Sequence, residues 1–393
     1  MPKLLSIDAA RAVVLDSVVP LAAEDVALDR ALHRVLAEDV VAARDVPPFD
    51  NSAMDGFVVT AGPANRRLAV VGESAAGAPA SRAPGDGEAV RVSTGAAVPE
   101  GLGGVIPIEQ VSEDGGAIVT HADTADGQHV RRAGEDIVAG QRVLARGTRL
   151  GPAELGVAAI SGRATVSCAL RPRVALLSTG DELRPPGAEL GPGQIHESNG
   201  LTLGALAQQA HAEVALRQVV ADDPHATRQA IKGALQAADV LILSGGVSVG
   251  PHDEVKEALA DLGVQRRFWR VALRPGKPTW FGTKDGKLVF GLPGNPVSAV
   301  VTFLLFVRPA LARLQNADPA ITRVQATLTE PIPRNPGRDE AVRVRLDEER
   351  RATPTGPQGS HQLSSMLDAD GLAIVIAGEG EAPAGATVAV ELI

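Results

Sequence analysis

The amino-acid sequence predicts an α/β protein of several domains, arranged around a doubly wound domain whose sheet is largely parallel. Three observations predict this fold class. The 393 residues, 45% of them hydrophobic, are enough for two to four domains with their own cores. Strand-like and helix-like segments alternate between about residues 170 and 315. Shorter β-prone segments broken by Gly and Pro precede and follow that region, so we expect a small β domain on each side of it.

The first part of the chain predicts helices interrupted by a β domain. Ser6 is expected to cap a helix with a one-sided apolar stripe, and a second helix is expected from about Leu28 to Asp39. From Ala42 to about Arg146 the runs are short and β-prone. Helical signal resumes at 151–160, so we interpret the β domain as an insertion between two helical parts of one unit.

The central region predicts alternating strands and helices. Strands are expected at Val174, Val214, Val240, Phe268 and Leu288, with helices beginning near Leu201, Pro224, Asp253 and Val297. We interpret Asn199 and Asp223 as the caps of the first two helices. The apolar run from Val297 to Val307 is expected to be a buried helix, too short to span a membrane. From about Ile321, alternating segments predict a small antiparallel β domain.

Composition and charge argue against several classes of protein. The formal net charge is −9, only 2% of residues are aromatic and Tyr is absent, so a nucleic-acid-binding surface is not expected. The N-terminus lacks the apolar segment of a secretory signal, and we expect no membrane span. The single cysteine, Cys168, cannot form an intramolecular disulfide, which fits a reducing cytoplasm.

Three central strands each run into a loop of small and polar residues. These loops contain Ser178, Thr179 and Gly180 after the first strand, Ser244, Gly245, Gly246 and Ser248 after the second, and Pro293, Asn295, Pro296 and Ser298 after the third. Ligands of open α/β sheets bind beyond the carboxyl ends of the strands, and the N–H groups of glycine turns bind anions. We therefore expect the loops to meet in one crevice that accepts a phosphate-bearing ligand.

Acidic residues follow two of these strands. Glu182 and Asp253 are expected at the same edge of the sheet, where one or two carboxylates and ligand phosphates can hold Mg²⁺. Each also fits the alternative that it caps a helix, Asp253 in particular. His196 is interpreted as a hydrogen-bonding residue because no second His stands at ligand spacing.

Cationic residues indicate an oxyanion site. Arg274 and Lys277 lie in the loop RPGKP, whose prolines and glycine hold both charges rigidly. Arg338, Arg343 and Ser360 in the last domain could add to this anion pocket, although they are equally consistent with solvated residues of a strand face.

The inserted β domain carries further polar candidates. Asp55 follows the polar loop PPFDNSAM, which is either a binding loop or a structural Asx turn. Thr94, and Asp136 in the segment RRAGED, stand beside glycines at the ends of β-prone runs. Together these residues suggest that the inserted domain presents a rim to a ligand.

The motifs PPFDNSAMDGF, RVSTGAAVP, RRAGEDI, LLSTGDEL, GQIHESN, SGGVSVGPHDE, RPGKP, GLPGNPVSA and GSHQLSSM, in this order, resemble those of the molybdopterin molybdenumtransferase family, the bacterial MoeA type that also forms the E domain of gephyrin. The resemblance runs from near residue 5 to the C-terminus. It implies an elongated helical region (1–45 and 141–168), an inserted β domain (46–140), a central molybdopterin-binding α/β domain similar to molybdopterin adenylyltransferases (169–318) and a C-terminal β-barrel-like domain (319–393).

The resemblance also implies an activity and a partner. It implies a homodimer in which the inserted domain of one subunit completes the site of the other. The implied reaction takes molybdate and adenylylated molybdopterin, hydrolyses the adenylate in a Mg²⁺-dependent step, and yields molybdenum cofactor and AMP. Onward transfer to molybdoenzymes or their chaperones is implied as well.

Individual residues match the functional positions of the family. The matching polar positions are Asp55, Thr94, Asp136, Glu182 and Asp253, and Arg274 with Lys277 match its molybdate-binding loop. Two departures stand out. Arg274 replaces a usual lysine, which keeps the charge but changes geometry and hydration, and Phe57 replaces a usual tyrosine and lacks its hydroxyl. Two alternatives to the transferase are an adenylyltransferase, because of the central domain, and a cofactor carrier or scaffold without turnover.

Overall fold

The computed structural model describes residues 4–99, 103–246 and 254–393. These residues form two compact units. The first contains the described residues of Met1–Glu24, His33–Ala37 and Cys168–Ile393, and the second those of Asp25–Leu32 and Glu38–Ser167. This division is coarser than the four parts expected from the sequence, whose boundaries stay a prediction.

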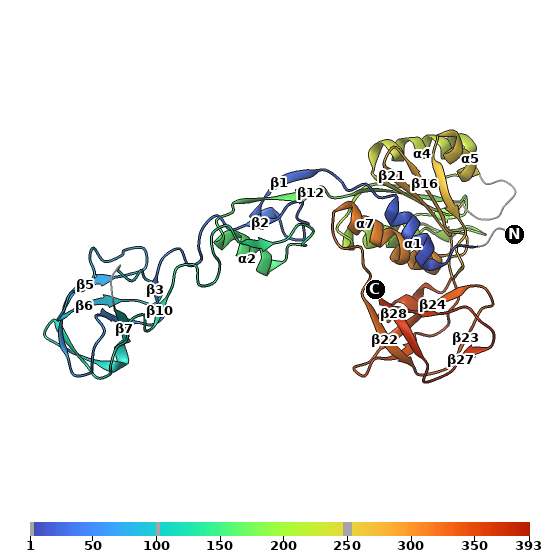
Figure 1. The fold of residues 1–393 in the computed structure, drawn as a ribbon. Helices are drawn as coiled ribbons and strands as arrows, with labels where there is room; N and C mark the ends of the chain where they lie inside the picture. Colours follow the sequence, from blue (N-terminus) through green and yellow to red (C-terminus); the bar gives the residue numbers. More distant parts are fainter. Residues whose placement is uncertain (1–3, 100–102, 247–253) are drawn as a thin grey trace. The chain divides into compact units, whose positions relative to one another are not determined.

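A six-stranded sheet is the centre of the first unit (Figure 1). Its strands, in spatial order, are β16 (Glu213–Val220), β13 (Arg173–Thr179), β17 (Val240–Ser244), β21 (Lys287–Leu292), β20 (Trp280–Lys284) and β18 (Gln265–Trp269). The first four are parallel, whereas β20 runs antiparallel to both of its neighbours. The sequence analysis missed β20, but the doubly wound domain that it predicted is confirmed.

Helices cover both faces of this sheet (Figure 1). One face packs against α4 (Pro224–Ala237) and α5 (Glu254–Asp261). The other packs against α1 (Ile7–Asp16), α3 (Asn199–Gln209) and the long helix described next. As predicted, Ser6 caps α1 and Asp223 caps α4 through side-chain hydrogen bonds to backbone N–H groups.

The long apolar helix consists of α6 (Pro296–Thr302), a π-helical turn (Phe303–Val307) and α7 (Arg308–Leu314). At 19 residues it is long and apolar enough to cross a membrane, but 83% of its most apolar stretch is buried inside the protein. The sequence analysis was therefore wrong to exclude a membrane span on the ground of length. The burial of the segment inside the protein identifies it as a core helix.

The predicted second helix, Leu28 to Asp39, is wrong. Only a 3₁₀ turn forms there, at Leu28–Arg30, and His33 adopts a positive φ of 63° that ends any helical run. Leu36 then bridges Cys168, and the N–H of Ala169 donates to the carbonyl of Val35. Strand-like pairing with a distant segment therefore overrides the local helical pattern.

The last part of the first unit is a closed β-barrel. Strands β24 (Asp339–Leu346), β25 (Arg351–Pro354), β22 (Arg323–Leu328), β28 (Thr387–Leu392) and β26 (Gly371–Val375) pair in this order, and β26 pairs back to β24. The predicted barrel-like domain is thereby confirmed. The short strand β19 (Leu273–Arg274) pairs with β24, so the loop RPGKP begins at the barrel. This unit also contains two small strand pairs, β14 (Leu183–Arg184) with β15 (Ile195–His196) and β23 (Ile332–Pro333) with β27 (Glu381–Ala382), and a 3₁₀ turn at Leu363–Met366.

The second unit holds a sheet of six strands. In spatial order these are β7 (Gly104–Pro107), β4 (Gly56–Val59), β6 (Glu88–Val92), β5 (Arg67–Ser74), β9 (Ala117–Thr120) and β8 (Val111–Asp114). The unit also contains α2 (Pro152–Ile160), a 3₁₀ turn (Ile108–Gln110), and the pairs β3 (Asn51–Ser52) with β10 (Val130–Arg131) and β2 (Val40–Val41) with β11 (Arg142–Leu144). Elsewhere, β1 (Ala23–Ala27) pairs with β12 (Thr165–Ala169). The β structure predicted for the inserted region is thus present as a six-stranded sheet.

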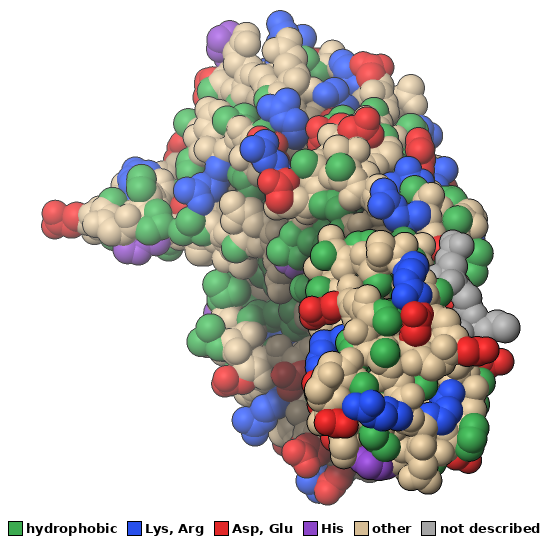
Figure 2. Space-filling view, turned by 90° about the vertical axis from the view of Figure 1, so that its left-hand side faces the viewer, with side chains coloured by type: hydrophobic (Ala, Val, Ile, Leu, Met, Phe, Trp, Pro, Cys, Tyr) green, Lys and Arg blue, Asp and Glu red, His purple; other side chains and the backbone are tan. Residues whose placement is uncertain are grey.

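Acidic and basic side chains are interspersed over the face shown in Figure 2. A mixed surface of this kind agrees with the acidic net charge of −9 and offers no broad basic patch on that face.

Candidate functional site

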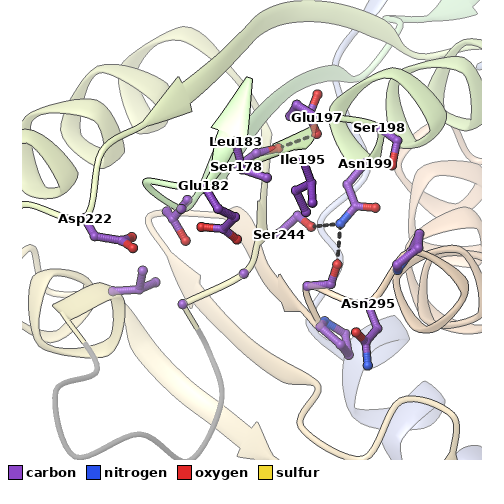
Figure 3. A pocket seen from close by; sticks show the side chains of 18 of the residues that line it. Ser178, Glu182, Leu183, Ile195, Glu197, Ser198, Asn199, Asp222, Ser244 and Asn295 are labelled. Carbon is purple, nitrogen blue, oxygen red and sulfur yellow. Dashed lines mark hydrogen bonds between the residues drawn. The ribbon is translucent and has the colours of Figure 1, made fainter. Parts of the chain in front are cut away.

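A pocket of about 840 Å³ lies at the carboxyl ends of the parallel strands of the first unit. Its walls come from the loops after β13, β17 and β21, the start of α3 and the loop after β16 (Figure 3). The strand-end residues Ser178, Ser244 and Leu292 lie side by side in register, so the three loops leave the sheet at the same level. The expected single crevice is present, and it is wide enough for a nucleotide-sized ligand.

The glycines of these loops allow the backbones to approach one another closely. Gly245 and Gly246 have φ values of 91° and 63°, and Gly180 has 151°. A Cβ on Gly245 would lie 2.9 Å from the carbonyl oxygen of Thr179, and one on Gly246 would lie 2.5 Å from a methyl carbon of Val255. Only glycine fits these positions, which leaves backbone groups facing the pocket as an anion would require.

Two serines at the strand ends are buried and held from the same side. The Oγ of Ser178 donates to Oε1 of Glu197 over 3.0 Å, and the N–H of Gly200 donates to the same oxygen over 2.6 Å. Nδ2 of Asn199 donates to Oγ of Ser244 over 2.7 Å and to the carbonyl oxygen of Gly294 over 2.8 Å. The dashed lines of Figure 3 mark the bonds from Ser178 and Asn199.

These contacts correct one prediction and add two residues. Asn199 is the first residue of α3, the cap position belongs to Ser198, and the amide of Asn199 bonds to strand-end loops instead of capping the helix. The sequence analysis included Glu197 only as part of the motif GQIHESN. One sequence signal could have identified both residues. Glu197 and Asn199 are polar, lie two positions apart, and stand where a helix begins directly after a short strand.

Carboxylates line one side of the pocket, where Figure 3 shows Glu182 and Asp222. Glu182 is exposed, and its carboxylate lies against Gly180, because a Cβ built on that glycine would be 2.4 Å from Oε2. Glu254, at the start of α5, also lines the pocket. Two predicted residues, Ser248 and Asp253, lie outside the residues that the structure describes.

One cation of the loop RPGKP, Arg274, is paired with an acid of the β-barrel. Nη1 of Arg274 donates to Oε1 of Glu340 over 2.7 Å, and Glu340 is largely buried. Lys277 is exposed. The pocket wall itself includes Pro278 but neither Arg274 nor Lys277. The structure thus brings Pro278, at the end of the loop, to the pocket, whereas neither cation is part of the wall.

The loop after β21 joins the pocket to the last domain. Pro293, Asn295 and Pro296 line the pocket, and Nδ2 of Asn295 donates to Oγ of Ser360 over 2.9 Å. Ser360 is therefore one hydrogen bond away from the wall, and its neighbour His361 is part of it. Ser298, by contrast, is buried inside α6 and does not line the pocket.

Neither arginine predicted in the last domain lines this pocket. Arg343 is only 1% exposed, and its guanidinium donates to Ser365 Oγ and to the carbonyl oxygens of Pro357 and Gly359. Burial lowers the pKa of Arg343 to about 10. Nε of Arg338 donates to Oδ1 of Asn335 within its own turn. Arg343 therefore fixes the segment that carries Ser360 and is no solvated strand-face residue, contrary to that alternative.

The second unit brings two of its three predicted residues together. The backbone N–H and Oγ of Thr94 donate to Oδ1 of Asp55 over 2.7 and 2.9 Å, and these bonds lower the pKa of Asp55, the backbone bond most. Asp136 is exposed at the turn after Arg132 and makes no side-chain hydrogen bond among the described residues. Phe57 is fully buried in the apolar core beneath the guanidinium of Arg91, where a hydroxyl would have to find a partner.

Comparison with known proteins decides the family. Three family profiles match successive parts of the chain: the MoeA N-terminal region (domain I and II) at residues 5–162, a probable molybdopterin binding domain at 175–313, and the MoeA C-terminal region (domain IV) at 325–393. A molybdopterin molybdenumtransferase of Haemophilus influenzae is 36% identical over 99% of this chain and 98% of its own. The chain belongs to the molybdopterin molybdenumtransferase family.

Other relatives agree with this family. A molybdopterin molybdenumtransferase 2 of Mycobacterium tuberculosis is 38% identical and covers 88% of this chain and 89% of its own. A solved structure of a molybdopterin biosynthesis protein from Pyrococcus horikoshii has a TM-score of 0.87 and 32% identity, and covers 99% of each chain. The predicted resemblance, the fold class and the expectation of an enzyme, a transferase of molybdenum cofactor biosynthesis, are confirmed.

Proposed function

We propose that this molybdenumtransferase family member transfers molybdenum from molybdate to adenylylated molybdopterin, and releases molybdenum cofactor and AMP in a Mg²⁺-dependent step. The observation that carries the proposal is the meeting of three strand-end loops in one pocket of about 840 Å³. A phosphate-linked pterin nucleotide is a large polar ligand, and this pocket combines glycine turns, hydroxyl groups and carboxylates.

The proposal gives each part of the pocket a role. The backbone groups of Gly245 and Gly246 face the phosphate linkage and stabilise charge that develops as the adenylate bond breaks. Glu182, exposed at the mouth and held beside Gly180, is available to orient water or a cation at this linkage. Arg274 and Lys277, which are not part of the wall, attract molybdate. Arg274 keeps further N–H donors for it, because only Nη1 bonds to Glu340.

The donor groups of the pocket fit a magnesium ion in kind. Apart from Glu197, whose Oε1 accepts hydrogen bonds from Ser178 and Gly200, the carboxylates in the described part of the pocket are Glu182, Asp222 and Glu254, and they offer oxygen, which Mg²⁺ prefers. The described residues contain no group of three or more His, Cys, Asp or Glu able to hold a metal by itself. Mg²⁺ usually takes one or two carboxylates together with substrate phosphates, so Glu182 would share the ion with the ligand. When bound, the ion neutralises phosphate charge.

Substitution of Glu182 tests the proposal. AMP release from adenylylated molybdopterin is measured with the unaltered protein, with Glu182→Ala, and with Glu189→Ala, a nearby exposed acid that does not line the pocket. We expect release to fall by about 100-fold in the Glu182 variant, the scale of a lost charge-stabilising group, and to persist in the control. Undiminished release would reject the role of Glu182. ATP consumption with bare molybdopterin would indicate an adenylyltransferase instead.

We further propose a homodimer in which Asp55, Thr94 and Asp136 of one subunit complete the pocket of the other. The support is the pair formed by Asp55 and Thr94, a negative group held on the surface of the inserted domain without an ion partner among the residues described. Mixed dimers test it. Asp55→Ala and Glu182→Ala proteins, each inactive, should regain about a quarter of normal activity when exchanged, because half of the dimers carry one intact site. No recovery would refute a shared site.

We also propose that the protein acts in the cytoplasm and that molybdoenzymes or their chaperones accept its product. The buried single thiol of Cys168 supports a reducing cytoplasm. Delivery of the product to molybdoenzymes or their chaperones would follow from the proposed reaction.

A further inference from the structure

The start of α3 contacts the ends of all three strands that form the pocket. Glu197 accepts the hydroxyl of Ser178 from the end of β13, and Asn199 donates to Ser244 at the end of β17 and to Gly294 after β21. Ser178 and Ser244 are register partners and only 4% exposed each. Glu197, just before the cap of α3, and Asn199, the first residue of α3, therefore hold adjacent strand ends together.

The chemistry of the acceptors fixes the orientation of the Asn199 amide. The carbonyl oxygen of Gly294 can only accept a hydrogen bond, so the group that faces it must be Nδ2 and not Oδ1. One amino group thus joins two loops that are otherwise held together by a 3.3 Å bond from the N–H of Gly245 to the carbonyl of Leu292. The connection continues outward, because Asn295 bonds to Ser360 of the last domain.

We propose that Glu197 and Asn199 are positioning residues that hold the strand-end loops in their ligand-binding arrangement. This inference rests on the proposed function for its effect on catalysis, but not for the mechanical role. Glu197 is only 6% exposed and its Oε1 already accepts two hydrogen bonds, which is the arrangement of a structural group. Both residues act through the serines and the glycine loops, so neither needs to touch the reacting atoms.

Hydrogen exchange of the ligand-free protein tests the mechanical role directly. In Asn199→Ala, two hydrogen bonds are lost, and we expect amide exchange in peptides covering 240–246 and 290–295 to accelerate about tenfold. Gln209→Ala, an exposed change near the end of the same helix, serves as control and should exchange as the unaltered protein does. Unchanged exchange in Asn199→Ala would overturn the inference, whatever reaction the protein catalyses.

Variants of Glu197 separate positioning from catalysis. Glu197→Gln keeps an oxygen that can accept from Ser178 and Gly200, so it should retain AMP release within a few-fold, whereas Glu197→Ala should lose about 100-fold through misplacement of the loops. Equal loss in both variants would contradict a positioning role. Asn199→Asp, which has the same size but no donor, should behave as Asn199→Ala does.

AMP binding, measured by calorimetry, links this inference to the proposed function. If AMP binds the unaltered protein and binds Asn199→Ala at least fivefold more weakly, both stand. If exchange accelerates as expected but AMP does not bind the unaltered protein, the positioning role stands and the proposed function fails. If AMP binds both proteins equally, the loops do not need Asn199 for ligand binding and the inference is overturned.

Discussion

Replacement of Gly180 by alanine is the sharpest test of how the pocket places Glu182. The φ of Gly180 is 151°, a region that L side chains rarely adopt. A Cβ there would lie 2.4 Å from Oε2 and 2.7 Å from Cδ of Glu182. The carboxylate is the far end of the flexible Glu182 side chain, so it can move away from the new methyl group. A shift of about 1 Å would restore ordinary contact distances.

The backbone strain and the displacement have different consequences. Strain at such a φ costs about 1–3 kcal/mol, which should lower the midpoint of urea unfolding. A displacement of about 1 Å in a catalytic group costs on the order of 100-fold in rate. Gly187→Ala is the matched control, because Gly187 also has a positive φ, 84°, but no atom within 4 Å of a built Cβ. It carries strain without touching Glu182.

Two measurements on both variants complete the test. We expect urea unfolding to show similar destabilisation of Gly180→Ala and Gly187→Ala, and steady-state AMP release to fall about 100-fold in Gly180→Ala alone. If Gly180→Ala releases AMP as fast as Gly187→Ala, the position of Glu182 against Gly180 has no bearing on catalysis, and its assigned role is wrong.

Three further substitutions and one labelling experiment have defined outcomes. Thr94→Val removes the weaker of the two hydrogen bonds that lower the pKa of Asp55, so carboxyl ¹³C NMR should show this pKa rising toward its ordinary value. As the pH is lowered, any activity that needs ionised Asp55 should then begin to fall at a higher pH than in the unaltered protein. Arg274→Ala should weaken molybdate binding about tenfold in calorimetry and leave AMP binding unchanged. Leu305→Ala, at a fully buried position of the long apolar helix, should lower the free energy of unfolding by about 2–5 kcal/mol in urea titration. Burial raises the pKa of the Cys168 thiol, so mass spectrometry should detect iodoacetamide labelling only after unfolding.

The sequence predicted the central sheet because its pattern is local. The parallel strands β13, β17 and β21 each contain a short apolar run and lead into a loop with glycine, as at Ser244–Gly246. Strands of this kind can be identified without knowledge of their partners. Strand β20, which lies between β21 and β18, was missed because WFGTK combines aromatic, small and charged residues without clear alternation. The helix expected from Leu28 failed for the opposite reason, since pairing of Leu36 with Cys168 defeats a good local pattern.

The sequence predicted only those residues of the candidate site that directly follow a strand of the central sheet. Glu182 and the glycine turns are next to their strands in sequence, so their meeting follows from the fold. Arg343 could not be placed in this way. Apolar and charged residues alternate along its strand, which does not show whether the charged residues face solvent. Arg343 is buried because it bonds to Gly359 and Ser365, which follow it by 16 and 22 residues. Glu197 and Asn199 were undervalued because the serines they hold are distant in sequence.

The register of the central sheet connects these observations. Residues of β17 are buried on both faces, so alternation of apolar and polar side chains cannot by itself exclude a slip of one residue between strands. The polar contacts at the strand ends can. A one-residue slip of β17 would turn Ser244 away from Asn199 and replace it by Leu243 or Gly245, leaving the amide without its acceptor. The hydrogen bonds of Glu197 and Asn199 therefore favour the register in which the three loops leave the sheet together, and the same bonds that shape the pocket help to specify the fold that creates it.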